Sequence, residues 1–337
     1  GGSLGGILPN DMYVELETKA LNFWLDHRDI RNFEFGKFTA EQNKLQRELL
    51  ANHYRLINAG FIHLGTETMQ ERAKEIYEDL INHPRVTIML EEPVEDIDLL
   101  SKKFDITVIA TGRTGYPEFE TFLRKRKIRY TDSSIDIGIR YEVANQIVEH
   151  LTKDLYEFKI VKNNVRTFCV NPSGFVVEEN GLANGHSFLE TKSDYTNFAV
   201  LYKYMVKNAS KFATKLKRQF NGVHVMPYGN FRGDEGVFNT GRTFSGAQED
   251  DFRDLMPSYV TDNLVSFIDG LDPVIPGIAN PENSVYAPEI KTNSIVPHMQ
   301  DLFQLTSNVY VIGDISGYTR GIMQATISAF YLAKKFI

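Results

Sequence analysis

The sequence predicts an α/β protein in which a β-rich insertion interrupts a parallel sheet. Two short apolar runs, residues 106–110 and 309–312, lack polar alternation. Such runs are typical of strands buried on both faces of a parallel sheet. Between them, residues 135–188 divide into β-like pieces separated by Gly, Asn and Pro, a pattern that favours antiparallel pairing.

A chain of 337 residues is long enough for about two domains. We place the first domain at residues 1–130 and 285–337, and the inserted β-rich domain, with its helices, at residues 131–284. The insertion is expected to form the substrate pocket.

Capping signals predict the first helices. Thr39 and Gln42 match a capping box that opens a helix running to Gly60. A second box at residues 68–71 opens a helix that Pro84 ends. We predict the remaining elements as strands at 86–90, 135–141, 158–161, 167–170 and 175–178, and helices at about 197–220, 250–269 and 322–336.

Composition excludes several classes of protein. The mixture, 42% hydrophobic and 24% charged, is that of an ordered globular chain. No run approaches the length of a membrane helix. The net charge of −7 provides no global basic field for nucleic acid or anionic lipid. Cys169 is the only cysteine, so we expect a reducing, cytoplasmic setting.

The strongest local signal follows the late apolar run. Gly313 and Asp314 form a turn between a strand and a helix, and ligands of open α/β sheets bind at such carboxyl ends. A carboxylate there can accept hydrogen bonds from sugar-type hydroxyls, or it can simply cap the next helix. The run at 106–110 likewise ends in Thr111 and Gly112, where the backbone can approach a ligand closely.

These two turns resemble the secondary FAD motifs of flavoproteins with two dinucleotide-binding folds. The whole chain resembles a family of uncharacterised FAD-dependent dehydrogenases, also called NAD(FAD)-utilizing dehydrogenases. The resemblance covers nearly the whole chain. Its further motifs are residues 135–143, 166–177, 184–187, 196–199, 286–291 and 317–322.

The resemblance implies an enzyme, an FAD-dependent oxidoreductase. Its flavin would exchange a hydride with a small-molecule substrate, and NAD(P)H is a candidate electron partner. The first domain would then be the FAD-binding domain. The residues that the resemblance assigns to the cofactor are Gly1, Gly2, Ser3, Val94, Thr111, Gly112, Gly313, Asp314, Arg320, Gly321 and Ile322.

One motif of that family is missing. No Gly-x-Gly-x-x-Gly occurs in the 337 residues, although in this family that motif holds the FAD pyrophosphate. The run Gly1–Gly6 resembles the glycine-rich loop that follows the motif. We therefore expect an FAD-binding domain that is incomplete at its N-terminus. A preceding segment or a separate chain would complete it.

The catalytic residues stay open. Cys169 and His186 are candidate redox and proton-transfer groups, and Glu289 lies in a motif of unknown role. For each of them a structural position is the favoured interpretation, since lone cysteines are usually buried small hydrophobes and a lone histidine in a Gly/Asn-rich stretch is usually a turn residue. His53, His63 and His83 show no metal-ligand spacing, so we predict no metal site.

Two alternative functions remain. Basic runs at residues 124–129 and 207–218 fit a solvated face or, alternatively, the RNA-binding patch of a tRNA-modifying flavoprotein. The acidic net charge argues against nucleic acid. The second alternative is a non-catalytic subunit or remnant that keeps the flavoprotein fold.

Overall fold

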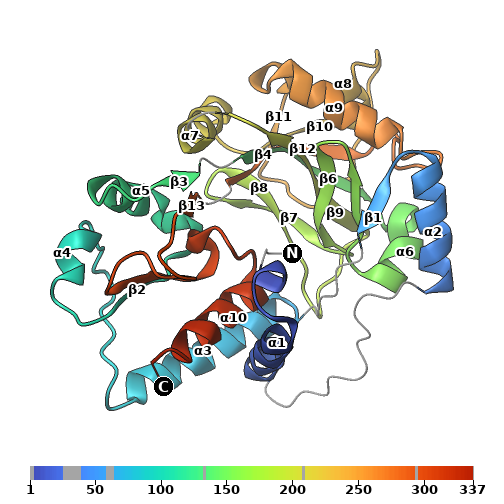
Figure 1. Ribbon diagram of the computed structural model, residues 1–337. Coiled ribbons are helices and arrows are strands. Elements are labelled where there is room, and N and C mark those ends of the chain that lie inside the picture. The colour runs from blue at the N-terminus through green and yellow to red at the C-terminus, as the bar shows by residue number, and fades with distance from the viewer. Residues whose placement is uncertain are drawn as a thin grey trace. The chain divides into compact units, whose positions relative to one another are not determined.

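Two sets of strands form the centres of two structural units (Figure 1). The computed structural model describes residues 4–25, 39–57, 64–131, 134–206, 209–292 and 295–336. Unit 1 draws on Gly1–Phe33, Lys74–Ser133 and Thr292–Ile337; unit 2 draws on Glu34–Ala73 and Ser134–Lys291. Residues 34–73 thus belong with the inserted region, whereas we expected them in the first domain.

Unit 2 is built on a mixed sheet of eight strands in the order β1-β5-β6-β9-β4-β12-β10-β11. β10 and β11 are parallel, while the other pairs of known register are antiparallel. A separate hairpin consists of β7 (Phe175–Glu179) and β8 (Leu182–His186). The sheet strands are β1 (Arg55–Ile57), β4 (Ile135–Ala144), β5 (Lys159–Lys162), β6 (Val165–Asn171), β9 (Tyr195–Tyr204), β10 (His224–Pro227), β11 (Gln248–Glu249) and β12 (Ser284–Thr292).

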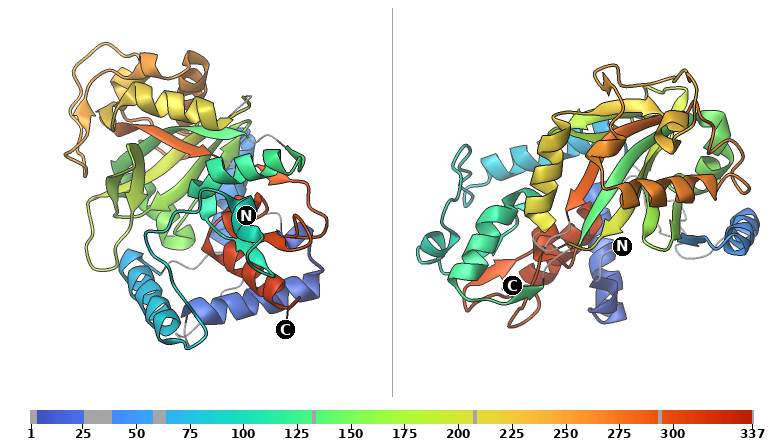
Figure 2. Two further views of the ribbon diagram at one scale, coloured as in Figure 1. Left: turned by 90° about the vertical axis from the view of Figure 1, so that its left-hand side faces the viewer. Right: turned by 90° about the horizontal axis from the view of Figure 1, so that it is seen from above.

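The two faces of β4 differ in chemistry. Its odd-numbered residues from Ile135 to Val143 enter the main hydrophobic core. Helices pack on this core, and Figure 2 shows α9 lying along the sheet. On the opposite face, Asp136, Arg140 and Glu142 are almost completely buried. The helices of unit 2 are α2 (Ala40–Ala51), α6 (Asn145–Leu155), α7 (Ala209–Phe220), α8 (Tyr228–Arg232), α9 (Ser258–Asp269) and the 3-10 turn η3 (Arg253–Leu255).

The described residues of unit 1 include two pairs of short strands. β2 (Thr107–Ile109) and β14 (Val309–Val311) are parallel, and β3 (Tyr130–Thr131) pairs antiparallel with β13 (Val296–Pro297). α1 (Asn10–Leu25) packs against α10 (Ile322–Ala333), and the Trp24 indole N–H donates to Thr326 at 2.8 Å (Figure 1). The other helices are α4 (Ile97–Ser101), α5 (Tyr116–Lys125) and the 3-10 turns η1 (Leu4–Gly6), η2 (Gly112–Gly115) and η4 (Gly313–Ser316).

Helix α3 (Thr66–Asn82) has residues in both units. It ends before Pro84, as predicted. Its start is corrected, because Met69 already donates its N–H to Gly65 O, so that the predicted box at 68–71 lies inside the helix. None of its described residues is buried. In the part of the chain that the structure describes, no helix is long and apolar enough to cross a membrane.

Several predicted elements are wrong, for physical reasons. Residues 195–204 form β9, not the first half of a helix, because Phe198, Val200 and Tyr202 alternate into the core. The helix that we expected to reach Gly60 ends at Ala51. His53 then adopts φ 65°, and β1 follows. Gly60 itself lies outside the described residues.

Three further expectations also need correction. The predicted strand at 86–90 has no regular structure. The helix predicted from residue 250 begins only at Ser258. Strand β2 is not buried on both faces, because Val108 is 42% exposed between the buried Thr107 and Ile109.

Candidate functional site

The two predicted turns lie at the same edge of unit 1. β2 and β14 run parallel with Val311 paired to Ile109, and Ile312 donates its N–H to Ile109 O at 2.9 Å. Thr111–Gly112 and Gly313–Asp314 each begin two residues after the last residue of these strands. Both turns therefore come to the carboxyl ends of neighbouring strands, the position at which open α/β sheets bind ligands.

Asp314 links its turn to the start of α10. Its Oδ1 accepts hydrogen bonds from the Thr319 hydroxyl at 3.1 Å and the Gly321 N–H at 3.2 Å. Gly321 is the N-cap residue of α10. The carboxylate thus holds the residue that precedes the first turn of α10, and its side chain stays 17% exposed.

Arg113 joins the two turns, and the sequence analysis missed it. Its Nε lies 3.7 Å from Asp314 Oδ2, which brings opposite charges together across β2 and β14. The signal was its position directly after Thr111-Gly112. Ser328 on α10 was also missed, although its hydroxyl accepts the Gly313 N–H at 3.0 Å.

The backbone is open at two of the predicted glycines. Gly112 (φ +62°) and Gly321 (φ +89°) have no heavy atom within 4 Å of the position a Cβ would occupy. The positive φ angles suit glycine, and the space beside them leaves the backbone accessible. A ligand could therefore approach both peptides.

The other residues predicted to bind the cofactor lie outside the two turns at Gly112 and Asp314. Ile322 begins α10 and is half exposed, and Arg320 is exposed beside the turn. Val94 is 45% exposed, lies before α4 and makes no hydrogen bond within the described ranges. Residues Gly1, Gly2 and Ser3 lie outside the described residues.

Unit 2 brings together residues whose roles the sequence left open. Arg140 on β4 and Glu289 on β12 form a completely buried ion pair, with 2.8 Å between Nε and Oε2. This contact is ionic and does not meet hydrogen-bond geometry. Arg140 Nη2 does donate to Glu289 Oε1 at 2.9 Å. On the outer side, Lys291 Nζ lies 3.1 Å from the same Oε1.

Cys169 and His186 lie around this pair. The Cys169 carbonyl accepts a hydrogen bond from Arg140 at 2.8 Å. Burial raises the pKa of the Cys169 thiol, which disfavours the reactive thiolate. His186 contacts Glu179 at 2.7 Å, and Asn184 connects Glu179 to Arg140. The arrangement supports a positioning network and gives no sign of a thiol nucleophile.

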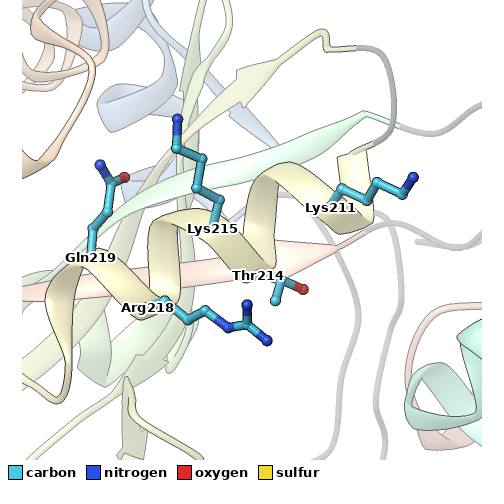
Figure 3. A pocket seen from close by; sticks show the side chains of 5 residues that line it. All are labelled: Lys211, Thr214, Lys215, Arg218 and Gln219. Atoms are coloured by element: carbon cyan, nitrogen blue, oxygen red, sulfur yellow. The ribbon is translucent and has the colours of Figure 1, made fainter.

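The second basic run forms part of α7. Lys211, Thr214, Lys215, Arg218 and Gln219 line a surface pocket of ≈ 490 Å³ (Figure 3). Helix α7 has no Asp or Glu, and Lys211, Lys215 and Arg218 have no ion pair within the described ranges. Lys207 of the predicted run lies outside them.

In the residues described here, no three His, Cys, Asp or Glu side chains gather as metal ligands would. No protein-family model matches the chain, and no curated protein is detectably similar to it.

Proposed function

We propose that the chain is an FAD-dependent oxidoreductase in which unit 1 contributes the cofactor site. The observation that carries this proposal is the parallel pairing of β2 with β14, which brings Thr111–Gly112 and Gly313–Asp314 to one sheet edge. Open α/β sheets bind nucleotide-type ligands at the carboxyl ends of parallel strands, where these two turns lie.

The residues present fit part of an FAD molecule. The open space beside Gly112 and Gly321 leaves the backbone there accessible to a cofactor. Asp314 would accept a hydrogen bond from a ribityl hydroxyl, and the N-terminus of α10 would face an electron-rich ring edge. When bound, the flavin supplies the hydride chemistry, and the protein supplies orientation and polarity.

We further propose that the pyrophosphate cradle comes from a segment or chain beyond these 337 residues. Unit 1 exposes many large hydrophobic side chains within one stretch of sequence, and this supports the proposal, because exposed apolar surface often marks a place where a partner binds. Those at least 40% exposed between residues 77 and 108 are Tyr77, Leu80, Ile81, Met89, Leu90, Val94, Leu99, Phe104, Ile106 and Val108.

The substitution Asp314→Ala tests the cofactor assignment. We expect it to weaken FAD retention by roughly ten- to a hundredfold, because a charge-assisted hydrogen bond is lost. The protein is the 337-residue chain preceded by a βαβ unit with Gly-x-Gly-x-x-Gly, and bound flavin is measured by absorbance after dialysis. The matched control is Asp105→Ala, an exposed carboxylate of the same unit. Equal flavin occupancy in both variants would remove Asp314 from the site.

The basic face of α7 favours one second candidate, a flavoprotein that binds RNA. Binding to unmodified tRNA should then fall steeply with salt. Replacing Lys211, Lys215 and Arg218 with Gln should lower the salt slope as well as the affinity. Replacing Lys153, which pairs with Glu149 at 2.6 Å on α6, should change neither. Salt-independent or absent tRNA binding would leave α7 as a solvated face.

A further inference from the structure

Unit 1 contains a pocket whose lining includes Tyr318, four residues after Asp314. This pocket of ≈ 720 Å³ is formed by three separate parts of the unit. We call it the Arg129 pocket, and its chemistry is set by Ile7, Arg129, His298, Met299, Leu302 and Tyr318.

One end of the Arg129 pocket is basic. β3 and β13 pair Thr131 with Val296 and Tyr130 with Pro297, and His298 extends this ladder by donating its N–H to Arg129 O at 2.7 Å. Residues directly opposite in an antiparallel ladder present their side chains on one face. Arg129 and His298 are therefore cross-strand partners whose side chains leave the ladder on the same face, and both line the pocket.

No acidic group in the described residues neutralises this pair. Neither the Arg129 nor the His298 side chain makes an ion pair or hydrogen bond there. Asp301, the one carboxylate of the pocket lining, is held instead by Lys335 at 2.6 Å. Two basic groups placed side by side repel when both are charged, and an anion between them would remove that repulsion.

Apart from Thr131 and Asp301, the rest of the pocket lining is apolar or aromatic. Met299, Leu302 and Tyr318 pack at the edge of the core between α1 and α10, and Ile7 is 43% exposed on the same pocket. Tyr318 also belongs to the turn region, since its N–H donates to Ser316 at the end of η4. The pocket wall is thus continuous with the candidate cofactor turn.

We propose that the Arg129 pocket binds a small molecule with a carboxylate head and an apolar body. Arg129 and His298 hold the carboxylate, and Ile7, Met299 and Leu302 contact the apolar body. This inference rests on the proposed function in one respect only: a ligand there is the oxidoreductase substrate. The apolar side chains of the lining favour an aliphatic or aromatic acid over a phosphate ester of a sugar.

Calorimetric titration of the full chain with octanoate tests the assignment. Octanoate should bind at one site at least roughly tenfold more tightly than 1-octanol, acetate or inorganic phosphate, since only octanoate satisfies both ends of the pocket. Arg129→Met keeps the side-chain stem and should lower octanoate affinity by about tenfold or more. Lys127→Met removes a cation two residues away, outside the pocket lining, and should leave affinity unchanged.

Four results would overturn the proposal. They are equal octanoate affinity in Arg129→Met and the parent chain, equal binding of octanol, phosphate binding as tight as that of octanoate, and no saturable binding. Titration with FAD separates this test from that of the proposed function. The FAD titration uses the chain preceded by a βαβ unit with Gly-x-Gly-x-x-Gly, since the 337 residues alone are expected to lack the pyrophosphate cradle. In that protein, octanoate binding without FAD binding would sustain the pocket and reject the flavoprotein, and FAD binding without octanoate binding would do the reverse.

Discussion

At the scale of single residues, the ion pair of Arg140 and Glu289 places two opposite charges in the interior of unit 2, where each depends on the other for compensation. Both side chains are fully buried, and Arg140 also donates to the Cys169 carbonyl, Asn184 and Asn197. Removing one member of a buried pair leaves the other charge without compensation. The pair therefore ties β4, β6, β8, β9 and β12 together only while both charges are present.

We expect Glu289→Gln to lower the free energy of unfolding by about 3 kcal/mol. Urea denaturation followed by circular dichroism measures it. The matched control is Glu15→Gln, which removes a carboxylate from the exposed pair with Lys334 and should have little effect. If both variants lost the same stability, the buried pair would have no special role.

Glu142 gives a pH-dependent prediction on the same face of the sheet. It accepts hydrogen bonds from the Thr243 N–H at 3.1 Å and the Tyr286 hydroxyl at 2.9 Å, but burial raises its pKa above the ordinary 4.5. At pH values between 4.5 and the raised pKa of Glu142, the folded protein binds more protons than the unfolded chain. Linkage then makes stability fall as pH rises through that window.

Glu142→Gln removes this titration. The difference in unfolding free energy, variant minus parent, should therefore increase from pH 4 toward neutral pH, and denaturation at a series of pH values measures it. A difference that decreased with pH would mean that the hydrogen bonds outweigh burial and lower the pKa.

At the scale of elements, local signals were sufficient where a few neighbouring residues decide the structure. The Thr39 hydroxyl accepts the Gln42 N–H at 3.2 Å, and Gln42 Oε1 accepts the Thr39 N–H at 3.0 Å, which confirms the predicted capping box of α2. Strands β2 and β14 and helix α10 were also predicted within one to three residues at each end.

The capping box can be measured directly. Thr39→Ala should cost about 1 kcal/mol of unfolding free energy, because a donor at the start of α2 loses its partner. Thr39→Ser keeps the oxygen and serves as the control. Equal stability of the Ala and Ser variants would show that α2 is held by packing of Leu49 instead.

Contacts between residues far apart in the sequence explain the features that the sequence analysis did not predict. Tyr54 is buried with its hydroxyl bonded to Phe267 O at 2.8 Å, so that the segment after α2 becomes a strand instead of a longer helix. Arg113 reaches Asp314 only because β2 and β14 are adjacent. The pairing of Arg140 with Glu289, 149 residues apart, had no local signal at all.

At the scale of the whole molecule, one edge of β2 has backbone groups that pair with no described strand. Thr107 donates to Asn308 O at 2.8 Å, and Ile109 accepts from Ile312 at 2.9 Å, so both face β14. The peptide groups of Val108 alternate to the other edge, where β2 pairs with no described strand. Unpaired strand edges beside exposed apolar side chains favour association.

We therefore expect the 337-residue chain, expressed alone, to purify without FAD or to aggregate. Preceding it with a βαβ unit that carries Gly-x-Gly-x-x-Gly should restore bound FAD, because the pyrophosphate holds most of the cofactor's charge and needs a glycine turn at a helix N-terminus. The same unit with alanines in place of those glycines is the control, since it still covers the edge but cannot cradle the pyrophosphate. Flavin absorbance and light scattering separate cofactor binding from solubility. Stoichiometric, sub-micromolar FAD binding by the 337 residues alone would mean that this chain holds the pyrophosphate by some other arrangement.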